Sequence, residues 1–405
     1  MAISRTSLKV ISLYTGVGGL DFGFEAVGFK TAVAVEMDPA ACRTIRLNRN
    51  WPMIEGDISA ISTREILQAG RLKVGEAAVL IAGPPCQPFS KSGYWVNGDT
   101  RRLDDPRSKT LDAFLRVLRG ARPKSFLLEN VYGLAYEGKD EGLKLLIDGI
   151  RRVNRATGDN YSVAWQMLNA ADYGVPQTRE RIFIVGSRDG REFDFPPPSH
   201  TDHIAPADLF LRTLAPHVPA WDAIGDLPRP RDEQTLTVRG KWGALLPTIP
   251  EGQNYLWHTN RRGGMPLFGW RTRYWSFLLK LSKRRPSWTI QAQPGAAIGP
   301  FHWENRRLTS KEMCRLQTFP EDIRFDCGRT EVQRMLGNAV PALLAEVIAG
   351  KMAEQFFGRK PIKRPTLLPT PKRPIPPEEE PGTVPKQYLK YVGNHADHPG
   401  ERRKP

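Results

Sequence analysis

The first 190 residues of the chain alternate short apolar stretches with amphipathic ones. Apolar runs of this length are typical of buried strands, and the segments between or after them have the spacing of helices. Because alternating strands and helices form βαβ units, the sequence predicts an α/β fold with a mostly parallel sheet flanked by helices. Strands are expected at residues 9–14, 31–36, 78–82, 125–129 and 181–186, and helices at residues 23–27, 40–48, 64–69, 110–118 and 141–152.

The composition changes after about Gly190. The following region, to about Arg324, is rich in proline, glycine, tryptophan and arginine, and it shows little helical periodicity before Thr309. This composition predicts a smaller, irregular part of the fold. Residues 359–405 are rich in proline, lysine and arginine and have few apolar side chains, so we expect a disordered basic tail there.

The charge balance points to an anionic partner. The chain has a formal net charge of +16, and basic proteins of this kind most often bind nucleic acid. Arginines are interleaved with tryptophans between Trp221 and Trp303, a pattern suited to phosphate contacts and base stacking. The alternatives are that the tryptophans form the core of a loop-rich domain and that the basic tail only affects solubility.

Cysteine spacing and the N-terminus limit the other classes of protein. The four cysteines form no Cys-x-x-Cys pair, so no metal site or disulfide framework is expected. The N-terminus has no signal-peptide core, and no apolar run approaches the roughly 18 residues of a membrane helix. We therefore expect a cytosolic protein with reduced thiols and no membrane partner.

A glycine loop follows the first predicted strand, with the sequence Thr-Gly-Val-Gly-Gly-Leu-Asp at residues 15–21. Glycines at this place let the backbone turn tightly and approach a ligand. Asp21 replaces the third glycine of the dinucleotide pattern, so a nicotinamide oxidoreductase fits poorly. Glu36 and Asp57 end the next two segments, where they could bond a ribose and an adenine amino group; both could instead be helix-capping carboxylates. Together these features describe an adenosine-bearing cofactor without a pyrophosphate.

The stretch Ala-Gly-Pro-Pro-Cys-Gln-Pro-Phe-Ser, residues 82–90, places Cys86 at the end of an apolar strand between prolines. Prolines stiffen this loop, and open α/β sheets bind ligands at the carboxyl ends of their strands. A free cysteine is more often a buried structural residue, so the loop alone does not identify a nucleophile.

The motifs in their order resemble those of the DNA (cytosine-5) methyltransferases, and the resemblance spans residues 14–341. The matching motifs are Tyr-Thr-Gly-Val-Gly-Gly at 14–19, Glu36, Asp57-Ile58, the Pro-Cys loop at 83–90, Glu-Asn-Val at 129–131, Gln-Thr-Arg-Glu-Arg at 177–181, Arg-Arg-Leu-Thr at 306–309 and Gly-Asn-Ala-Val-Pro at 337–341. Tyr14-Thr15 stands where the family more often has Phe-Ala or Phe-Ser, and Met335-Leu336 precedes Gly337 where glutamine often leads.

The resemblance implies a catalytic set. Cys86 would attack C6 of cytosine, Glu129 would protonate N3, and Arg181 would contact O2. Arg179 would support the loop that carries Cys86, and Asn130 would orient it. The structural alternatives are an ordinary strand-end carboxylate for Glu129 and a surface ion pair of the arginines with Glu180.

The resemblance also implies S-adenosylmethionine as cofactor and a Rossmann-like methyltransferase fold. The expected cofactor-binding residues are Tyr14, Thr15, Gly16, Gly18, Gly19, Leu20, Glu36, Met37, Asp57, Ile58, Pro85, Leu111, Asn338, Ala339 and Val340. The catalytic domain would comprise residues 1–189 and 329–358, and residues 190–328 would form the target-recognition domain.

Double-stranded DNA would be the substrate, with the target cytosine flipped out and residues 91–107 closing over it. The compact length, without added chromatin-type domains, suggests the modification half of a bacterial restriction–modification pair, which shares its site with an endonuclease. We expect a monomer. Two alternatives stay open from the sequence: a tRNA cytosine-5 methyltransferase on the same scaffold, and a catalytically silent DNA-binding paralogue. Intact Cys86, Glu129 and Arg181 argue against the second alternative.

Overall fold

The protein, as a computed structural model, is described for residues 7–85, 109–131, 141–202, 214–231, 234–271 and 274–393. Seven strands form one sheet in the order β3-β2-β1-β4-β5-β7-β6. The strands are β1 (Leu8–Leu13), β2 (Phe29–Glu36), β3 (Met53–Glu55), β4 (Val79–Ala82), β5 (Ser125–Asn130), β6 (Ala164–Asn169) and β7 (Glu180–Ser187). The five predicted strands are confirmed to within two residues. Asp57 was expected at the end of a strand, and β3 ends two residues before it, whereas β6 was not expected.

The sheet is mixed. Neighbouring strands from β3 to β5 run parallel, and β7 is antiparallel to both β5 and β6. As a result, the chain leaves β1, β2, β4 and β5 at the same edge of the sheet at which it enters β7. Ligands bind at this edge in open α/β sheets, so the topology gathers the predicted site residues there.

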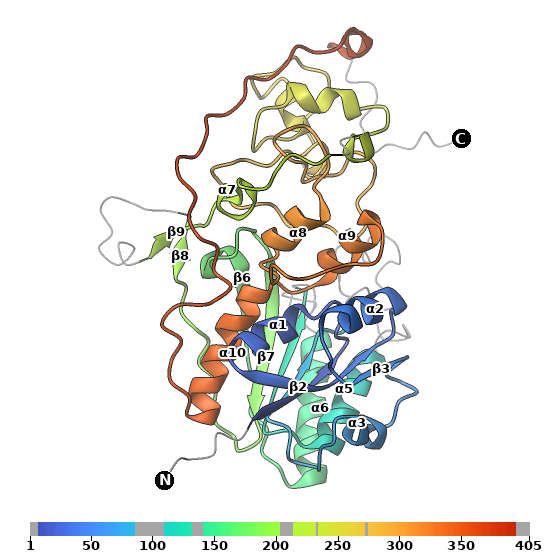
Figure 1. Ribbon diagram of the computed structural model, residues 1–405, viewed down its shortest axis with the longest axis vertical. Coiled ribbons are helices and arrows are strands. Elements are labelled where there is room, and N and C mark those ends of the chain that lie inside the picture. The colour runs from blue at the N-terminus through green and yellow to red at the C-terminus, as the bar shows by residue number, and fades with distance from the viewer. Residues whose placement is uncertain are drawn as a thin grey trace.

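Helices cover both faces of the sheet (Figure 1). Successive strand residues point to opposite faces, so Ile11 packs in a cluster with α3, α5 and α6, while Val10 packs in another with α1 and α10. The helices that flank the sheet are α1 (Gly19–Ala26), α2 (Pro39–Asn48), α3 (Thr63–Ala69), α5 (Lys109–Ala121), α6 (Glu141–Thr157) and α10 (Ala342–Phe357). The predicted α/β fold with helices on a largely parallel sheet is confirmed.

The irregular region, residues 190–328, has short elements and an apolar core of its own around Trp242, Tyr255 and Phe268. Another cluster joins this region to the sheet part, because Val17 and Phe22 near the glycine loop share a core with Leu281. The described elements after β7 and before α10 are the strands β8 (His200–Thr201) and β9 (Ala215–Pro216), the helices α7 (Ala220–Ile224), α8 (Ser310–Leu316) and α9 (Arg329–Asn338), and the 3-10 turns Gln234–Leu236, Gly243–Thr248 and Tyr255–His258.

Residues 359–393, here called the C-terminal strap, leave α10 and run along the outside of the molecule to the irregular region (Figure 1). Two buried carboxylates in the body accept hydrogen bonds from the strap. Glu346 of α10 accepts them from the backbone N–H groups of Thr366 (2.6 Å) and Leu367 (2.9 Å), and Asp222 of α7 accepts one from that of Lys372 (2.9 Å). These bonds fix the strap because a buried carboxylate without donors is costly.

The strap ends in the 3-10 turn Lys386–Tyr391, which packs into the core of the irregular region. Tyr388 is 2% exposed, and its ring stacks on Trp242 with 5.4 Å between the ring centroids. Its hydroxyl donates a hydrogen bond to the Lys241 carbonyl at 2.8 Å. The expectation of a disordered tail does not hold for residues 359–393. Composition alone cannot show that buried carboxylates and an apolar core elsewhere in the fold bind this segment. Residues 394–405 lie outside the described residues.

Within the described residues, one stretch, Arg329–Phe357, is long and apolar enough to cross a membrane by length and composition. It consists of α9 and α10, and 78% of its most apolar window is buried inside the protein. Its apolar character therefore matches that of a core helix, packed against the sheet and α1.

Candidate active site

The glycine loop after β1 turns through left-handed backbone conformations. Tyr14, Gly16 and Gly18 have φ angles of 54°, 55° and 83°. Glycine adopts such angles without steric cost, whereas a residue such as tyrosine adopts them mainly where the surrounding fold imposes them, often at functional sites. A Cβ atom built on Gly16 meets nothing within 4 Å, so the space beside this loop is open.

Glu36, at the end of β2, holds the loop from the side. Its carboxylate accepts hydrogen bonds from the backbone N–H of Gly16 at 2.7 Å and of Met37 at 2.8 Å. It also accepts a hydrogen bond from the backbone N–H of Asp38 at 2.8 Å. Since a carboxylate offers about four lone-pair positions, Glu36 keeps about one for a ligand hydroxyl. The Met37 side chain beside it is 65% exposed, an apolar surface open toward solvent.

The other cofactor candidates gather around the same edge. Tyr14, Ile58 and Leu111 belong to one apolar cluster, and the Tyr14 hydroxyl donates to the Thr110 carbonyl at 2.8 Å. Asp57 is exposed, and hydrogen bonds from Ser59 lower the pKa of its carboxyl, which keeps it ionised. An ionised hydrogen-bond acceptor, Asp57, therefore lies next to an apolar surface. This combination suits a purine ring that carries an amino group.

Residues 338–340 approach the glycine loop from the far end of the chain. A Cβ atom on Gly19 would lie 2.3 Å from the Val340 carbonyl oxygen, so only glycine permits this contact. Val340 packs with Leu20 in the same apolar cluster, and Asn338 at the end of α9 is exposed. The cofactor candidates from residues 14–20 and 338–340 thus lie together, although more than 300 residues separate them in sequence.

Glu129, which is buried, and Arg181, which is half-buried, form an ion pair at the edge where β5 ends and β7 begins. The Arg181 Nε lies 3.0 Å from a Glu129 carboxylate oxygen. Burial raises the pKa of Glu129, and Arg181 and Arg179 partly offset this effect. Desolvation favours the neutral form of a carboxyl, so Glu129 keeps a proton at a higher pH than an exposed glutamate does.

The Pro-Cys loop starts beside this pair. A Cβ atom on Gly83 would lie 3.6 Å from a Glu129 carboxylate oxygen, and Pro85 is exposed. Cys86 itself lies outside the described residues, as do residues 91–107. The described part of the loop therefore leads from Glu129 toward the predicted nucleophile.

Arg179 is buried and makes a contact that the sequence did not suggest. Its Nη2 donates to the Gly337 carbonyl at 2.8 Å, which ties the start of β7 to the end of α9. Its predicted support of the Cys86 loop stays a prediction. Nearby, Gln177 is also buried, and it bonds Gln317 at 3.2 Å and the backbone N–H of Ile290 at 3.2 Å.

Asn130 is buried at the end of β5, and its side chain accepts a hydrogen bond from the backbone N–H of Val131 at 2.8 Å. Its predicted role in orienting the Cys86 loop stays a prediction. The alternative of a surface ion pair with Glu180 does not fit Arg181, whose guanidinium pairs with Glu129 and donates to the backbone carbonyl of Glu180 at 2.7 Å.

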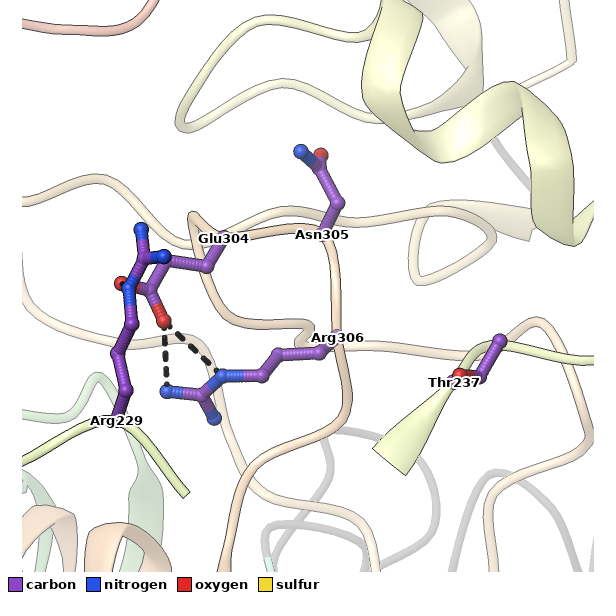
Figure 2. Close-up of a pocket in the computed structure, with 5 residues that line it drawn as sticks. All are labelled: Arg229, Thr237, Glu304, Asn305 and Arg306. Atoms are coloured by element: carbon purple, nitrogen blue, oxygen red, sulfur yellow. Dashed lines mark hydrogen bonds and ion pairs between the residues drawn. The ribbon is translucent and has the colours of Figure 1, made fainter. Parts of the chain in front are cut away.

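The arginine of the Arg-Arg-Leu-Thr motif anchors the irregular region. Arg306 bonds Glu312 of α8 twice, at 3.0 and 2.8 Å, and also pairs with Glu304. Figure 2 shows Glu304 between Arg229 and Arg306, while Asn305 points away from them. These side chains and Thr237 line a polar cavity of about 210 Å³. The residues that line this cavity are distant in sequence from the predicted catalytic residues. Their ion pairs hold this part of the irregular region to α8.

Sequence reasoning did not find the role of Asp21. Its buried carboxylate accepts hydrogen bonds from Ser12 and Thr31, both at 2.9 Å, and burial raises its pKa to about 6. The aspartate appeared only as a departure from the dinucleotide pattern, and no signal in the sequence marks it as buried. Among the described residues, no cluster of His, Cys, Asp and Glu could hold a metal ion.

Comparison with known proteins agrees with this geometry. Residues 8–354 match the family described as C-5 cytosine-specific DNA methylase. The Type II methyltransferase M.SacI of Streptomyces achromogenes is 41% identical over 374 residues, covering 86% of this chain and 93% of the relative. The Type II methyltransferase M.NgoFVII of Neisseria gonorrhoeae is 33% identical, with 84% of each chain covered.

Solved structures share the fold. A protein of E. coli encoded within a prophage, proposed to be a DNA modification methyltransferase, superposes with a TM-score of 0.62 at 23% identity, covering 87% of this chain and all of that one. The Dnmt2 methyltransferase of S. pombe gives a TM-score of 0.56 at 18% identity, covering 87% and 98%. The chain belongs to the C-5 cytosine-specific DNA methylase family. It is a DNA cytosine-5 methyltransferase, and the resemblance stated from its motifs is confirmed.

Proposed function

We propose that the protein transfers a methyl group from S-adenosylmethionine to C5 of a flipped cytosine in a specific double-stranded DNA sequence, through a covalent bond between Cys86 and C6. The observation that carries this mechanism is the ion pair of buried Glu129 with half-buried Arg181, at 3.0 Å. The pair stands beside Gly83, three residues before Cys86, at the edge where ligands bind in such sheets.

The chemistry follows from the weakness of cytosine C5 as a nucleophile. Attack of the Cys86 thiolate forms an S–C6 bond, and ring electrons move to N3, which takes a proton from Glu129. The resulting enamine makes C5 nucleophilic toward the methyl group. Water then takes the C5 proton, and the C5–H electron pair forms the C5=C6 double bond as the S–C6 bond breaks and releases the thiolate. The N3 proton returns to Glu129.

The environment of Glu129 suits a proton donor. Burial raises the pKa of its carboxyl, so the proton that N3 needs is retained at higher pH. Arg181 presents a planar fork of hydrogen-bond donors, which suits the charge that develops near cytosine O2. The Arg181 guanidinium can thus bind both Glu129 and the cytosine ring that Glu129 protonates.

The residues at the glycine loop fit S-adenosylmethionine. Glu36 has acceptor capacity for ribose hydroxyls, Asp57 is ionised for an adenine amino group, and exposed Met37 offers an apolar face to the purine. The open space beside Gly16 leaves room for the amino-acid part of the cofactor. When bound, S-adenosylmethionine supplies the electrophilic methyl group.

Double-stranded DNA requires base flipping, because C5 and C6 of a stacked cytosine cannot be reached. The net charge of +16 supports attraction to the phosphate backbone. By analogy with the Type II relatives, the protein would act as the modification enzyme of a restriction–modification system in a bacterial cytoplasm, as a monomer that shares a site with an endonuclease.

The covalent step is tested with a DNA duplex in which 5-fluorocytosine replaces the target cytosine. Fluorine cannot leave C5 as a proton does, so the wild-type protein and S-adenosylmethionine should give an adduct that survives denaturing electrophoresis. Cys86→Ser should give none, and Cys327→Ser, which changes a half-buried cysteine that is not among the predicted catalytic residues, should behave as wild type. An adduct with Cys86→Ser, or its absence from the active wild-type protein, would refute the covalent mechanism.

A further inference from the structure

Two tryptophans of the irregular region remain at the surface. Trp242 and Trp303 are buried in apolar clusters, whereas Trp275 and Trp288 are 39% and 38% exposed. The exposed pair is in mutual contact, with 5.7 Å between the ring centroids and an edge-to-face angle of 71°. Large aromatic side chains that stay exposed in a folded protein often mark a binding surface.

Trp288 lies next to the segment that leads into the catalytic strand. Its neighbour Ser287 accepts a hydrogen bond from the backbone N–H of Thr178 at 2.8 Å, and Thr289 donates one to the Thr178 carbonyl at 2.7 Å. Thr178 precedes Arg181 by three residues, which span roughly 10 Å of extended chain. The segment that carries Trp288 is therefore hydrogen-bonded to the chain that leads into Arg181.

The backbone beneath the pair is fixed. The Trp275 carbonyl accepts a hydrogen bond from the Asn254 side chain at 2.7 Å, and the next residue, Ser276, bonds Gln291 at 2.9 Å. The two indole side chains above this backbone are partly exposed. A rigid base with exposed rings allows stacking with little loss of conformational entropy on binding.

Cationic side chains accompany the rings. Arg284 and Arg285 are exposed, and they precede Trp288 by four and three residues. Arginine next to exposed aromatic rings is the combination that binds nucleic-acid strands, with the guanidinium groups on phosphates and the rings on bases. The charge of this surface therefore favours DNA over an apolar protein partner.

We infer that Trp275 and Trp288 form a stacking ridge that contacts the nucleobases beside the flipped cytosine. This inference rests on the proposed function. Extrusion of a base costs a few kcal/mol because its neighbours lose a stacking partner. The ridge offers a replacement surface at that place, so it stabilises the extruded state without reading the sequence by hydrogen bonds.

The test uses the full-length protein, S-adenosylmethionine and a duplex with the cytosine context that the wild-type protein methylates. 2-Aminopurine is placed next to the target, since its emission rises when it is unstacked. Trp288→Ala should raise KM for DNA roughly 5- to 150-fold, the loss of one stacked base at ~1–3 kcal/mol, and should brighten the emission of the complex. Its kcat at saturating DNA should change less than KM.

Two variants serve as controls. Trp288→Phe keeps an aromatic face and should restore most of the affinity and the dim emission. Trp165→Ala removes a tryptophan that is 48% exposed on β6, outside the irregular region, and should match the wild type. Trp275→Ala provides a second test of the ridge should Trp288→Ala fail to fold.

Wild-type KM and wild-type emission in both alanine variants would overturn the inference. An equal loss of DNA affinity in Trp288→Ala and Trp288→Phe would also overturn it, because it would indicate a packing defect. Failure of the proposed function looks different, because the wild-type protein would then methylate no cytosine in any duplex.

Discussion

At the level of single residues, burial changes the pKa of two carboxyl groups. Glu129 and Asp21 are both buried, and burial raises the pKa of each. Glu129 pairs with an arginine at the predicted site of the cytosine, whereas Asp21 bonds two hydroxyl groups beneath the glycine loop. The first carboxyl is thus placed for proton transfer and the second for holding the loop.

Glu129→Gln tests the proton donor. The amide has nearly the same shape and can still donate a hydrogen bond, but it cannot transfer a proton, so we expect kcat to fall by about 10²–10⁴. Glu180→Gln changes an exposed carboxylate on the same edge and should leave kcat within about twofold of wild type. Methyl transfer to DNA under saturating cofactor is the measurement, and near-normal kcat in Glu129→Gln would contradict the assignment.

Asp21→Asn tests the buried carboxyl through pH. Because folding raises the pKa of Asp21 to about 6, the folded state binds a proton that the unfolded state has released, and this contribution to stability is lost as pH rises from about 4 to about 6. Asparagine can keep both hydroxyl contacts without the charge. The Tm of the variant relative to wild type should therefore increase from pH 4 to pH 7, and an unchanged difference would refute the argument.

Among the helices and strands, those strands that form long apolar runs were predictable from the sequence. Strands that are very short or buried on one side only were not. β3 is only three residues long, and β6 is an edge strand that exposes Trp165 and Gln166, so neither forms an apolar run. The contact of Arg179 with Gly337 joins residues 158 positions apart, which no local pattern reveals. The candidate site residues were named from specific motifs and their roles stay predictions, whereas no motif indicated their packing partners.

The C-terminal strap gives a test at this scale. Tyr388→Ala removes a buried ring that stacks on Trp242, and the cavity should cost about 3–5 kcal/mol of unfolding free energy. Tyr388→Phe keeps the ring and loses only the hydrogen bond to Lys241, which should cost about 0.5–1.5 kcal/mol. Urea denaturation distinguishes the two variants. Equal, small losses would mean that the strap is not part of the cooperative fold.

At the scale of the whole molecule, the sheet part and the irregular region are joined twice. One apolar cluster mixes residues of the glycine loop with residues of the irregular region, and the strap reaches from α10 to the core around Trp242. These connections fix the proposed DNA-recognition surface relative to the Glu129–Arg181 pair. Such fixed geometry matters for catalysis, because small misplacements of a bound base lower the rate strongly.

We propose that this chain methylates cytosine C5 in DNA by means of Cys86. The most direct measurement is base-resolution mapping of 5-methylcytosine in unmethylated genomic DNA after incubation with S-adenosylmethionine and either the wild-type protein or Cys86→Ser. We predict methyl groups at one recurring sequence with the wild-type protein and none with the variant. A folded, cofactor-binding wild-type protein that leaves DNA unmethylated, or equal methylation by Cys86→Ser, would contradict the account.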